Sequence, residues 1–263
     1  MKCIKNFLLI LILLFGFNTA LANNQRETLI LFDSSGSMVD PFEGKTKIEH
    51  AADAVFNILQ QMPNDEKIGL RTIGVHPSQI MNLLNAGRKE ICQQTLLHNP
   101  IRSYNEEHII GSLKELYPFG PSPLAYALRT VVENDFQHYT PEKHIILITD
   151  GYETCDGNPC EYIKYLMTQR DDIIIDVVAI GANKYDLSYL QCLTDSTGGK
   201  IYDVQRPMDI VPVVKQLTNQ ISPQQPTAKP QQQSTINNFA QQPIKLGPQK
   251  KILYKNYLLE FYD

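Results

Sequence analysis

The sequence predicts an α/β fold with a mainly parallel central sheet flanked by helices on both faces. Short apolar runs rich in Ile, Leu and Val alternate with longer segments of helical spacing, which is typical of this class. The runs are almost continuously apolar, as strands covered on both faces are. The 263 residues are 43% hydrophobic and 20% charged, which excludes a wholly disordered, collagenous or multi-span membrane chain.

Five segments have the length and composition of buried strands, and the last is expected at an edge of the sheet. They are residues 28–32, 68–75, 144–149, 173–180 and 200–203. Residues 76–103 show no regular period, although an additional strand is considered around residues 95–98.

Six segments have helical spacing. They are residues 47–61, 106–116, 123–136, 159–169, 186–196 and 207–219. An apolar stripe runs along the first of them and consists of Ala51, Ala54, Val55, Ile58 and Leu59. Pro123 and Pro159 stand in the first turn of their segments, where proline is tolerated.

Residues 1–22 have the three parts of a secretory signal peptide: a short basic head, an apolar run and the small-residue site Ala20-Leu21-Ala22. The mature chain would then begin at Asn23. The alternative is an uncleaved anchor, but the run is short for the ~20 residues of a spanning helix. No other stretch is long and apolar enough to span a bilayer. We therefore expect an exported protein, periplasmic or secreted to the cell surface.

The rest of the chain divides into three parts by composition. Residues 23–222 form the expected globular domain, and residues 223–250 are a Gln/Pro-rich stretch that is typical of a disordered linker. Residues 251–263 are apolar, with Tyr254, Tyr257, Leu258 and Phe261 at helical spacing. This segment either folds back on the domain or docks on a second partner.

The charge is unevenly distributed. Residues 23–222 hold 17 basic and 26 acidic side chains, a net charge of −9, whereas residues 223–263 hold five basic and two acidic ones. An acidic surface repels phosphate backbones, and no basic stripe with interleaved aromatic residues offsets it. We therefore expect no nucleic-acid partner.

Four cysteines remain once residues 1–22 are removed: Cys92, Cys155, Cys160 and Cys192. An even number in an exported chain predicts disulfides. Of the three connectivities, Cys155 with Cys160 is favoured because the residues between them are rich in turn formers, and Cys92 with Cys192 then follows by elimination. A four-thiolate zinc site is the alternative, but the usual paired short spacings are absent.

Oxygen-bearing side chains gather after two of the predicted strands. Asp33, Ser35 and Ser37 follow the first strand around Gly36, which permits a tight turn. Asp150 ends the strand at residues 144–149, and Ser122 precedes a helix. In an open parallel sheet the carboxyl ends of the strands meet at one edge, where ligands bind. Such oxygen ligands suit Mg²⁺, Mn²⁺ or Ca²⁺.

With these motifs the sequence resembles the von Willebrand factor A domain family. The metal-ion-dependent adhesion site of that family is matched here by Asp33-x-Ser35-x-Ser37, by Ser122-Pro123-Leu124 and by Thr149-Asp150-Gly151. The likeness runs through most of residues 27–219 and implies a Rossmann-like sheet with one Mg²⁺ or Mn²⁺ at its edge. Ser122 replaces the usual threonine, which keeps the hydroxyl and loses a methyl group. Cysteines after Asp150 further resemble a bacterial secreted subgroup.

These features favour a non-enzymatic, metal-dependent binding protein of adhesion type. With two carboxylates, the ion would stay electrophilic and accept an acidic side chain from a protein partner. The alternative is a periplasmic scaffold or assembly factor that uses residues 251–263 as a second docking site. A hydrolase is disfavoured because no G-x-S-x-G elbow or H-E-x-x-H pattern occurs. Glu153, Asp40 and Glu43 are expected to be solvated loop acids, and the six histidines to be surface or structural residues.

Overall fold

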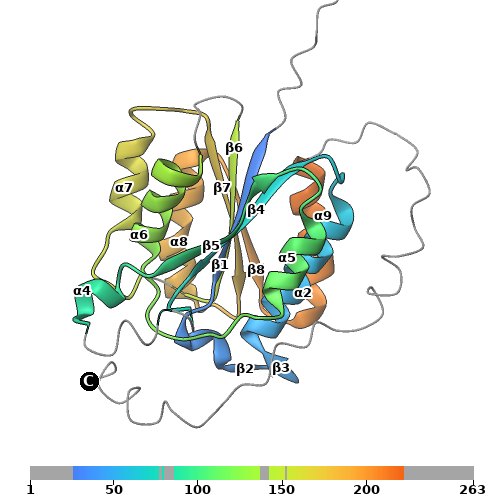
Figure 1. The fold of residues 1–263 in the computed structure, drawn as a ribbon, viewed down its shortest axis with the longest axis horizontal. Coiled ribbons are helices and arrows are strands. Elements are labelled where there is room, and N and C mark those ends of the chain that lie inside the picture. Colours follow the sequence, from blue (N-terminus) through green and yellow to red (C-terminus); the bar gives the residue numbers. More distant parts are fainter. Residues whose placement is uncertain (1–25, 77–78, 80–85, 137–141, 152, 222–263) are drawn as a thin grey trace, which may run out of the picture.

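A computed structural model describes residues 26–76, 79, 86–136, 142–151 and 153–221, which form a six-stranded sheet between two layers of helices (Figure 1). The strand order is β5-β4-β1-β6-β7-β8. Neighbouring strands pair in parallel, apart from β5, which pairs antiparallel with β4. The predicted α/β fold with a mainly parallel sheet is therefore confirmed.

The strands follow the apolar runs closely. Those of the main sheet are β1 (Glu27–Asp33), β4 (Lys67–Ile73), β5 (Thr95–Arg102), β6 (Lys143–Thr149), β7 (Ile173–Ile180) and β8 (Ile201–Val204). A small antiparallel hairpin of β2 (Pro41–Phe42) and β3 (Lys45–Thr46) leads into the first long helix. All seven residues of β6 are buried, which accounts for the apolar run at its centre, residues 145–148.

The helices alternate with the strands along the chain. They are α2 (Lys47–Gln61), α4 (Arg88–Ile91), α5 (Glu106–Leu113), α6 (Leu124–Thr130), α7 (Pro159–Leu166), α8 (Lys184–Thr197) and α9 (Ile210–Ile221). Two short 3₁₀ turns are η1 (Gly36–Val39) and η3 (Pro207–Asp209), and the π-helical turn η2 (Val131–Asp135) continues α6.

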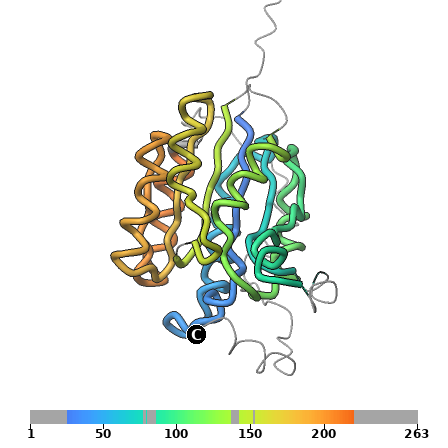
Figure 2. The backbone as a smooth tube through the Cα atoms, turned by 90° about the vertical axis from the view of Figure 1, so that its left-hand side faces the viewer, coloured from blue at the N-terminus to red at the C-terminus, as the bar shows by residue number. Residues whose placement is uncertain are grey.

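The two helical layers bury opposite faces of the sheet. Helices α2, α5 and α9 cover one face, and α6, α7 and α8 cover the other, where Figure 2 shows them side by side. Because side chains alternate along a strand, Ile30 and Phe32 of β1 lie in the first core, and Leu29 and Leu31 lie in the second. The sheet is therefore packed on both faces, and the loops at the carboxyl ends of its strands start from buried positions.

Several boundaries differ from the prediction, and three of the differences concern β5, β4 and the start of α9. The additional strand considered near residues 95–98 is β5, which is longer and lies at the antiparallel edge. Strand β4 ends at Ile73 because Gly74 has a φ of +102°, and a Cβ atom there would lie 2.9 Å from the Ser34 carbonyl oxygen. Residues 207–219 begin with the 3₁₀ turn η3 before α9 starts at Ile210.

Both predicted disulfide pairings are wrong, because the structure joins Cys92 to Cys155 and Cys160 to Cys192. Asn158 caps α7 by accepting a hydrogen bond from the Glu161 amide, which places Cys160 inside the helix. Helix α7 packs on α8, so Cys160 meets Cys192 there with a Cα–Cα distance of 5.8 Å. Cys155 stays in the loop before α7 and reaches the segment that precedes β5.

The predicted signal peptide at residues 1–22, the linker at 223–250 and the terminal segment at 251–263 lie outside the described residues. Within the described part of the chain, no helix has the length and apolar character needed to cross a membrane.

Candidate metal centre

Asp33 is the last residue of β1 and so lies at the carboxyl edge of the sheet. Figure 1 shows the β2–β3 hairpin at the bottom of the view. Its side chain is buried, and both carboxylate oxygens accept hydrogen bonds. Oδ1 accepts from the Ser35 amide at 2.8 Å. Oδ2 accepts from the hydroxyl of Ser122 at 3.1 Å and from that of Thr149 at 2.6 Å. The carboxylate is therefore fixed by three donors from three segments.

Ser35, Ser37 and Asp150 continue this set of contacts. The hydroxyl oxygens of Ser35 and Ser37 are 3.3 Å apart, and Ser37 donates to Oδ1 of Asp150 at 2.9 Å. Asp150 follows the central strand β6 and is buried. All five side chains predicted to ligate a metal thus lie together at one edge of the sheet, although they come from three separate segments.

Backbone hydrogen bonds between two loops bring Ser122 to this edge. The Gly36 amide donates to the Gly120 carbonyl at 2.8 Å, and the Phe119 amide donates to the Ser34 carbonyl at 2.9 Å. Gly120 has a φ of +84°, and a Cβ atom there would lie 2.7 Å from Cγ2 of Val75. The chain can pass this point only with glycine, and Ser122 follows two residues later.

The sequence reasoning missed two residues of the site, Thr149 and Lys47. Thr149 is buried and donates to Asp33, and its position beside Asp150 at a strand end was a usable signal. The ammonium of Lys47 donates to Oδ2 of Asp150 at 2.7 Å and lies 3.7 Å from Oδ2 of Asp40. No spacing in the sequence indicates Lys47, because the β2–β3 hairpin folds it back onto the site.

A capping interaction places Lys47. The Glu49 carboxylate accepts hydrogen bonds from the amide and the hydroxyl of Thr46, each at 2.8 Å, which fixes the first turn of α2. These hydrogen bonds also lower the pKa of Glu49. Lys47 is the first residue of that turn, so its side chain begins beside Asp150.

Two of the three expected loop acids are exposed, and the third is not. Asp40 and Glu43 are exposed, as expected. The expectation that Glu153 is a solvated loop acid is wrong, because only 8% of it is exposed. Its carboxylate accepts hydrogen bonds from the Ala125 amide at 2.7 Å and the Cys155 amide at 2.6 Å. Burial raises the pKa of Glu153, while these hydrogen bonds oppose the rise. Glu153 therefore holds the loop after Asp150 against the start of α6.

The electrostatics of the site favour a cation. Burial raises the pKa of Asp33 above its usual value, and the negative charge of Asp150 raises it further, whereas hydrogen bonds from Thr149 and Ser35 lower it. Lys47 contacts Asp150 but not Asp33 in the described contacts. A second positive charge between the two carboxylates would stabilise their ionised forms.

Other metal chemistry has little support in the described residues. No group of three or more His, Cys, Asp and Glu side chains gathers among them at a single point. Two histidines make structural contacts: His50 with the Phe42 carbonyl at 2.7 Å and His144 with Asp176 at 2.8 Å. The candidate site therefore offers oxygen donors alone.

With this fold and this edge of the sheet, the chain belongs to the von Willebrand factor type A domain family, which matches residues 26–203. Two relatives are proteins of Bacillus subtilis (strain 168). The uncharacterized protein YwmC is 27% identical over 230 residues, which cover 83% of this chain and 99% of YwmC. The uncharacterized protein YwmD is 33% identical over 161 residues, which cover 60% of this chain and 70% of YwmD.

Solved structures share the fold at low sequence identity. A von Willebrand factor type A protein from Catenulispora acidiphila superposes with a TM-score of 0.58 at 15% identity, over 75% of this chain and 42% of that one. Proximal thread matrix protein 1 from the mussel byssus, with a zinc-occupied MIDAS motif, superposes with a TM-score of 0.56 at 11% identity. The match covers 74% of this chain and 45% of that one. The pilus adhesin SpaC from Lactobacillus rhamnosus GG superposes with a TM-score of 0.55 at 14% identity, over 76% of this chain and 31% of SpaC. The chain thus spans less than half of each of these structures.

Proposed function

We propose that this protein is a non-enzymatic, divalent-metal-dependent binding protein of adhesion type. Its site holds one Mg²⁺, Mn²⁺ or Ca²⁺ ion with the side chains of Asp33, Ser35, Ser37, Ser122 and Asp150. One observation carries the proposal: side chains from three separate segments meet at the carboxyl edge of the sheet. Ser122 contacts Asp33, and Ser37 contacts both Ser35 and Asp150, at oxygen–oxygen distances of 2.9 to 3.3 Å. The Ser35 amide joins the two sets by donating to Asp33. Such an edge is where open α/β sheets bind their ligands.

The donor chemistry of these residues fits a hard cation. Two carboxylates and three hydroxyls provide oxygen ligands without nitrogen or sulfur, the set that Mg²⁺, Mn²⁺ and Ca²⁺ prefer. Burial raises the pKa of Asp33, and the negative charge of Asp150 raises it further; a bound cation would offset this second cause. A bound ion would supply an electrophilic position that accepts a carboxylate from a partner protein.

Some residues of the site orient the Asp33 carboxylate, and others lie nearer the surface, where a partner could reach them. Thr149 and the Ser35 amide orient the Asp33 carboxylate, which lies deepest in the site. Ser37 and Asp150 lie farther along the set of contacts, and Ser37 is only partly buried. The partner would therefore approach from the side of Ser37, past the loop that begins at Gly36.

The comparisons support a binding role. Von Willebrand factor type A domains are generally interaction modules, and this chain belongs to that family. One protein of the same fold has a zinc-occupied MIDAS motif, and another is a pilus adhesin. The two disulfides suit an oxidising compartment, which agrees with the proposed signal peptide at residues 1–22 and with a periplasmic or cell-surface protein.

Calorimetric titration of the purified protein with MgCl₂ and MnCl₂ tests the metal site. We expect one ion per chain for the parent protein and no binding heat for Asp150→Ala. Asp195→Ala is the matched control, because Asp195 is an exposed acid on α8 whose side chain accepts a hydrogen bond from Gln191. Equal binding by the parent and Asp150→Ala would contradict the site assignment.

Cross-linking on intact cells tests the partner. The amount of partner protein cross-linked to the parent protein is compared in Mg²⁺ and in EDTA. Asp33→Ala, which is expected not to bind the metal, is the negative control. We expect a captured protein that needs both the metal and Asp33, and whose capture is lost when one of its own acidic residues is changed to the amide. Capture that is equal in EDTA would contradict a metal-dependent contact.

A further inference from the structure

The loop that follows Asp150 makes close contact with Ser122. The Ser122 amide donates to the Thr154 hydroxyl at 2.7 Å, and the Thr154 amide donates to the Ser122 carbonyl at 3.1 Å. Thr154 therefore holds both backbone polar groups of a candidate metal ligand. Any movement of Thr154 would shift the Ser122 hydroxyl relative to Asp33.

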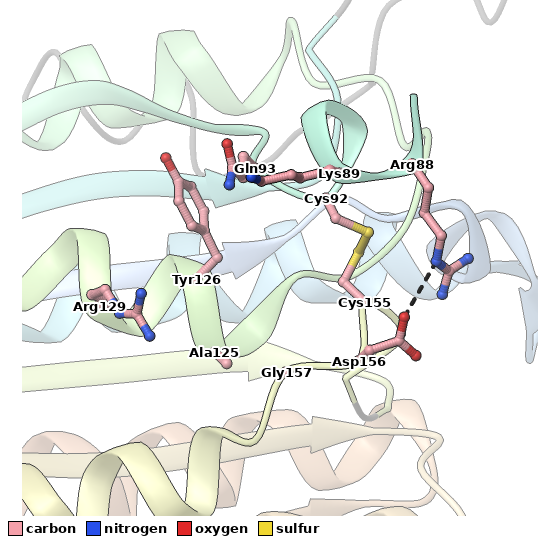
Figure 3. Close-up of a pocket in the computed structure, with 10 residues that line it drawn as sticks. All are labelled: Arg88, Lys89, Cys92, Gln93, Ala125, Tyr126, Arg129, Cys155, Asp156 and Gly157. Carbon is pink, nitrogen blue, oxygen red and sulfur yellow. Dashed lines mark ion pairs between the residues drawn. A yellow bond between two sulfur atoms is a disulfide. The ribbon is translucent and has the colours of Figure 1, made fainter. Parts of the chain in front are cut away.

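Thr154 is in turn held by the segment before β5. The guanidinium of Arg88 donates to the Thr154 carbonyl at 2.9 Å and lies 3.4 Å from Oδ2 of Asp156. Cys155 forms the disulfide with Cys92 four residues beyond Arg88, as Figure 3 shows. The Arg88 and Asp156 side chains are 54% and 85% exposed, so this ion pair contributes little. The disulfide is the strong link between the two segments.

Glu153 secures the inner side of the same loop. Its carboxylate accepts from the amides of Ala125 and Cys155, and so ties the loop to the first turn of α6. The packing is close at Gly157, where a Cβ atom would lie 2.8 Å from Oε2 of Glu153. The loop is therefore held on two sides, by a buried carboxylate and by the disulfide.

We propose that the Cys92–Cys155 disulfide positions Ser122, through Thr154, and thereby sets the affinity of the site for a divalent metal. This inference rests on the proposed function and deepens it. The disulfide joins residues 63 apart in the sequence, so without it the loop between Asp150 and α7 would keep only the exposed contacts of Arg88 to the segment before β5. Groups that orient a metal ligand typically change metal affinity by about 10- to 100-fold when they are lost.

The second disulfide provides a matched control. Cys160–Cys192 joins α7 to α8, and in the described contacts neither residue touches Ser122, Thr154 or Asp33. Loss of either disulfide should lower the melting temperature, because each restrains the unfolded chain. Metal affinity separates the two roles, because only the Cys92–Cys155 disulfide is linked to a metal ligand.

The experiment compares Cys92→Ser/Cys155→Ser with Cys160→Ser/Cys192→Ser by calorimetric titration with MgCl₂ and by thermal unfolding. We expect the first variant to bind Mg²⁺ roughly 10- to 100-fold more weakly and the second to keep the parent affinity, while both melt earlier. Equal affinity in the first variant, or an equal loss in both, overturns the inference. Absence of Mg²⁺ binding by the parent protein would instead contradict the proposed function itself.

A second pair of variants keeps the inference testable if the first variant does not fold. Thr154→Val retains both disulfides but removes the hydroxyl that accepts from the Ser122 amide, whereas Thr154→Ser keeps that hydroxyl. We expect weaker Mg²⁺ binding for Thr154→Val and parent affinity for Thr154→Ser. Parent affinity in Thr154→Val would show that the Thr154 hydroxyl does not position Ser122, and would overturn the inference.

Discussion

The ammonium of Lys47 lies 2.7 Å from Oδ2 of Asp150, so a cation of the protein itself contacts one of the two candidate metal-ligating carboxylates. Lys47 is mostly buried, and Asp40 lies within 3.7 Å of it as a second, exposed partner. A bound ion and the ammonium would repel each other, because both are positive. The Lys47–Asp150 ion pair therefore weakens, but does not cancel, the attraction of the two carboxylates for a metal ion.

We predict that Lys47→Met binds Mg²⁺ more tightly than the parent protein. Two unit charges 4 Å apart interact by about 4 kcal/mol at an effective dielectric constant of 20, and solvent screening leaves roughly tenfold in affinity. Without metal the variant should melt earlier, because Asp150 loses its ion pair. Calorimetric titration measures the affinity, and Lys45→Met is the control because Lys45 pairs with Asp53. Weaker binding by Lys47→Met would contradict this prediction.

We predict that Ser122→Ala weakens Mg²⁺ binding about tenfold, because the variant lacks a proposed ligand hydroxyl, which also donates to Asp33 at 3.1 Å. Ser122→Thr should keep binding, since threonine supplies the same oxygen. The measurement is a titration of both variants with MgCl₂ under identical conditions. Parent affinity in Ser122→Ala would remove Ser122 from the ligand set.

We predict that His98 stays neutral in the folded protein until the pH falls to about 4. The pKa of His98 is lowered to about 4, chiefly by burial and also by the charges of His76 and Arg71. An unfolded chain protonates histidine near pH 6.5. Between these values the unfolded state binds the additional proton, so the free energy of unfolding should decrease as the pH falls from about 6.5 to about 4.

A proton NMR titration of the His98 ring tests this pKa. The ring signals should move with a midpoint close to pH 4. The Thr72 hydroxyl, whose oxygen lies 3.1 Å from Nε2 of His98, would then contact a neutral imidazole ring at every pH well above 4. A midpoint near 6.5 would contradict the assigned environment of His98.

We predict that removal of residues 223–263 leaves the melting temperature of the domain unchanged. The Gln/Pro-rich composition of residues 223–250 is typical of a linker. Of the two alternatives for residues 251–263, the prediction follows from docking on a second partner, in which this segment adds no contact to the domain. Thermal unfolding of the full and shortened chains measures the difference. A large loss of stability would show that the terminal segment packs on the domain.

The sequence was informative about the sheet because buried parallel strands are unbroken apolar runs. The residue range predicted for β7 agrees with the structure, and β1 differs by one residue at each end. Strand β5 was harder to recognise, because it lies at an edge and most of its residues are only partly buried, which weakens the apolar pattern.

The candidate site could be predicted where residues sit at strand ends or in motifs that resemble those of the family, as Ser35, Ser37 and Ser122 do, but not where it depends on long-range folding of the chain. Asp33 and Asp150 come directly after or at the end of neighbouring strands, so their proximity follows from the parallel pairing of β1 and β6. Lys47 and the Cys92–Cys155 disulfide depend on how a hairpin and an irregular segment fold back. Local spacing carries no information about such long-range contacts.

The most direct test of the central claim is thermal unfolding of the parent protein and of Asp33→Ala, each in EDTA and in saturating Mg²⁺, Mn²⁺ or Ca²⁺. A ligand that binds only the folded state must raise the stability, by about 2.7 kcal/mol at 100 times its dissociation constant. We predict a clear rise in the melting temperature of the parent protein and none in Asp33→Ala. An equal rise in both proteins, or no rise in the parent with any of the three ions, would contradict the metal site.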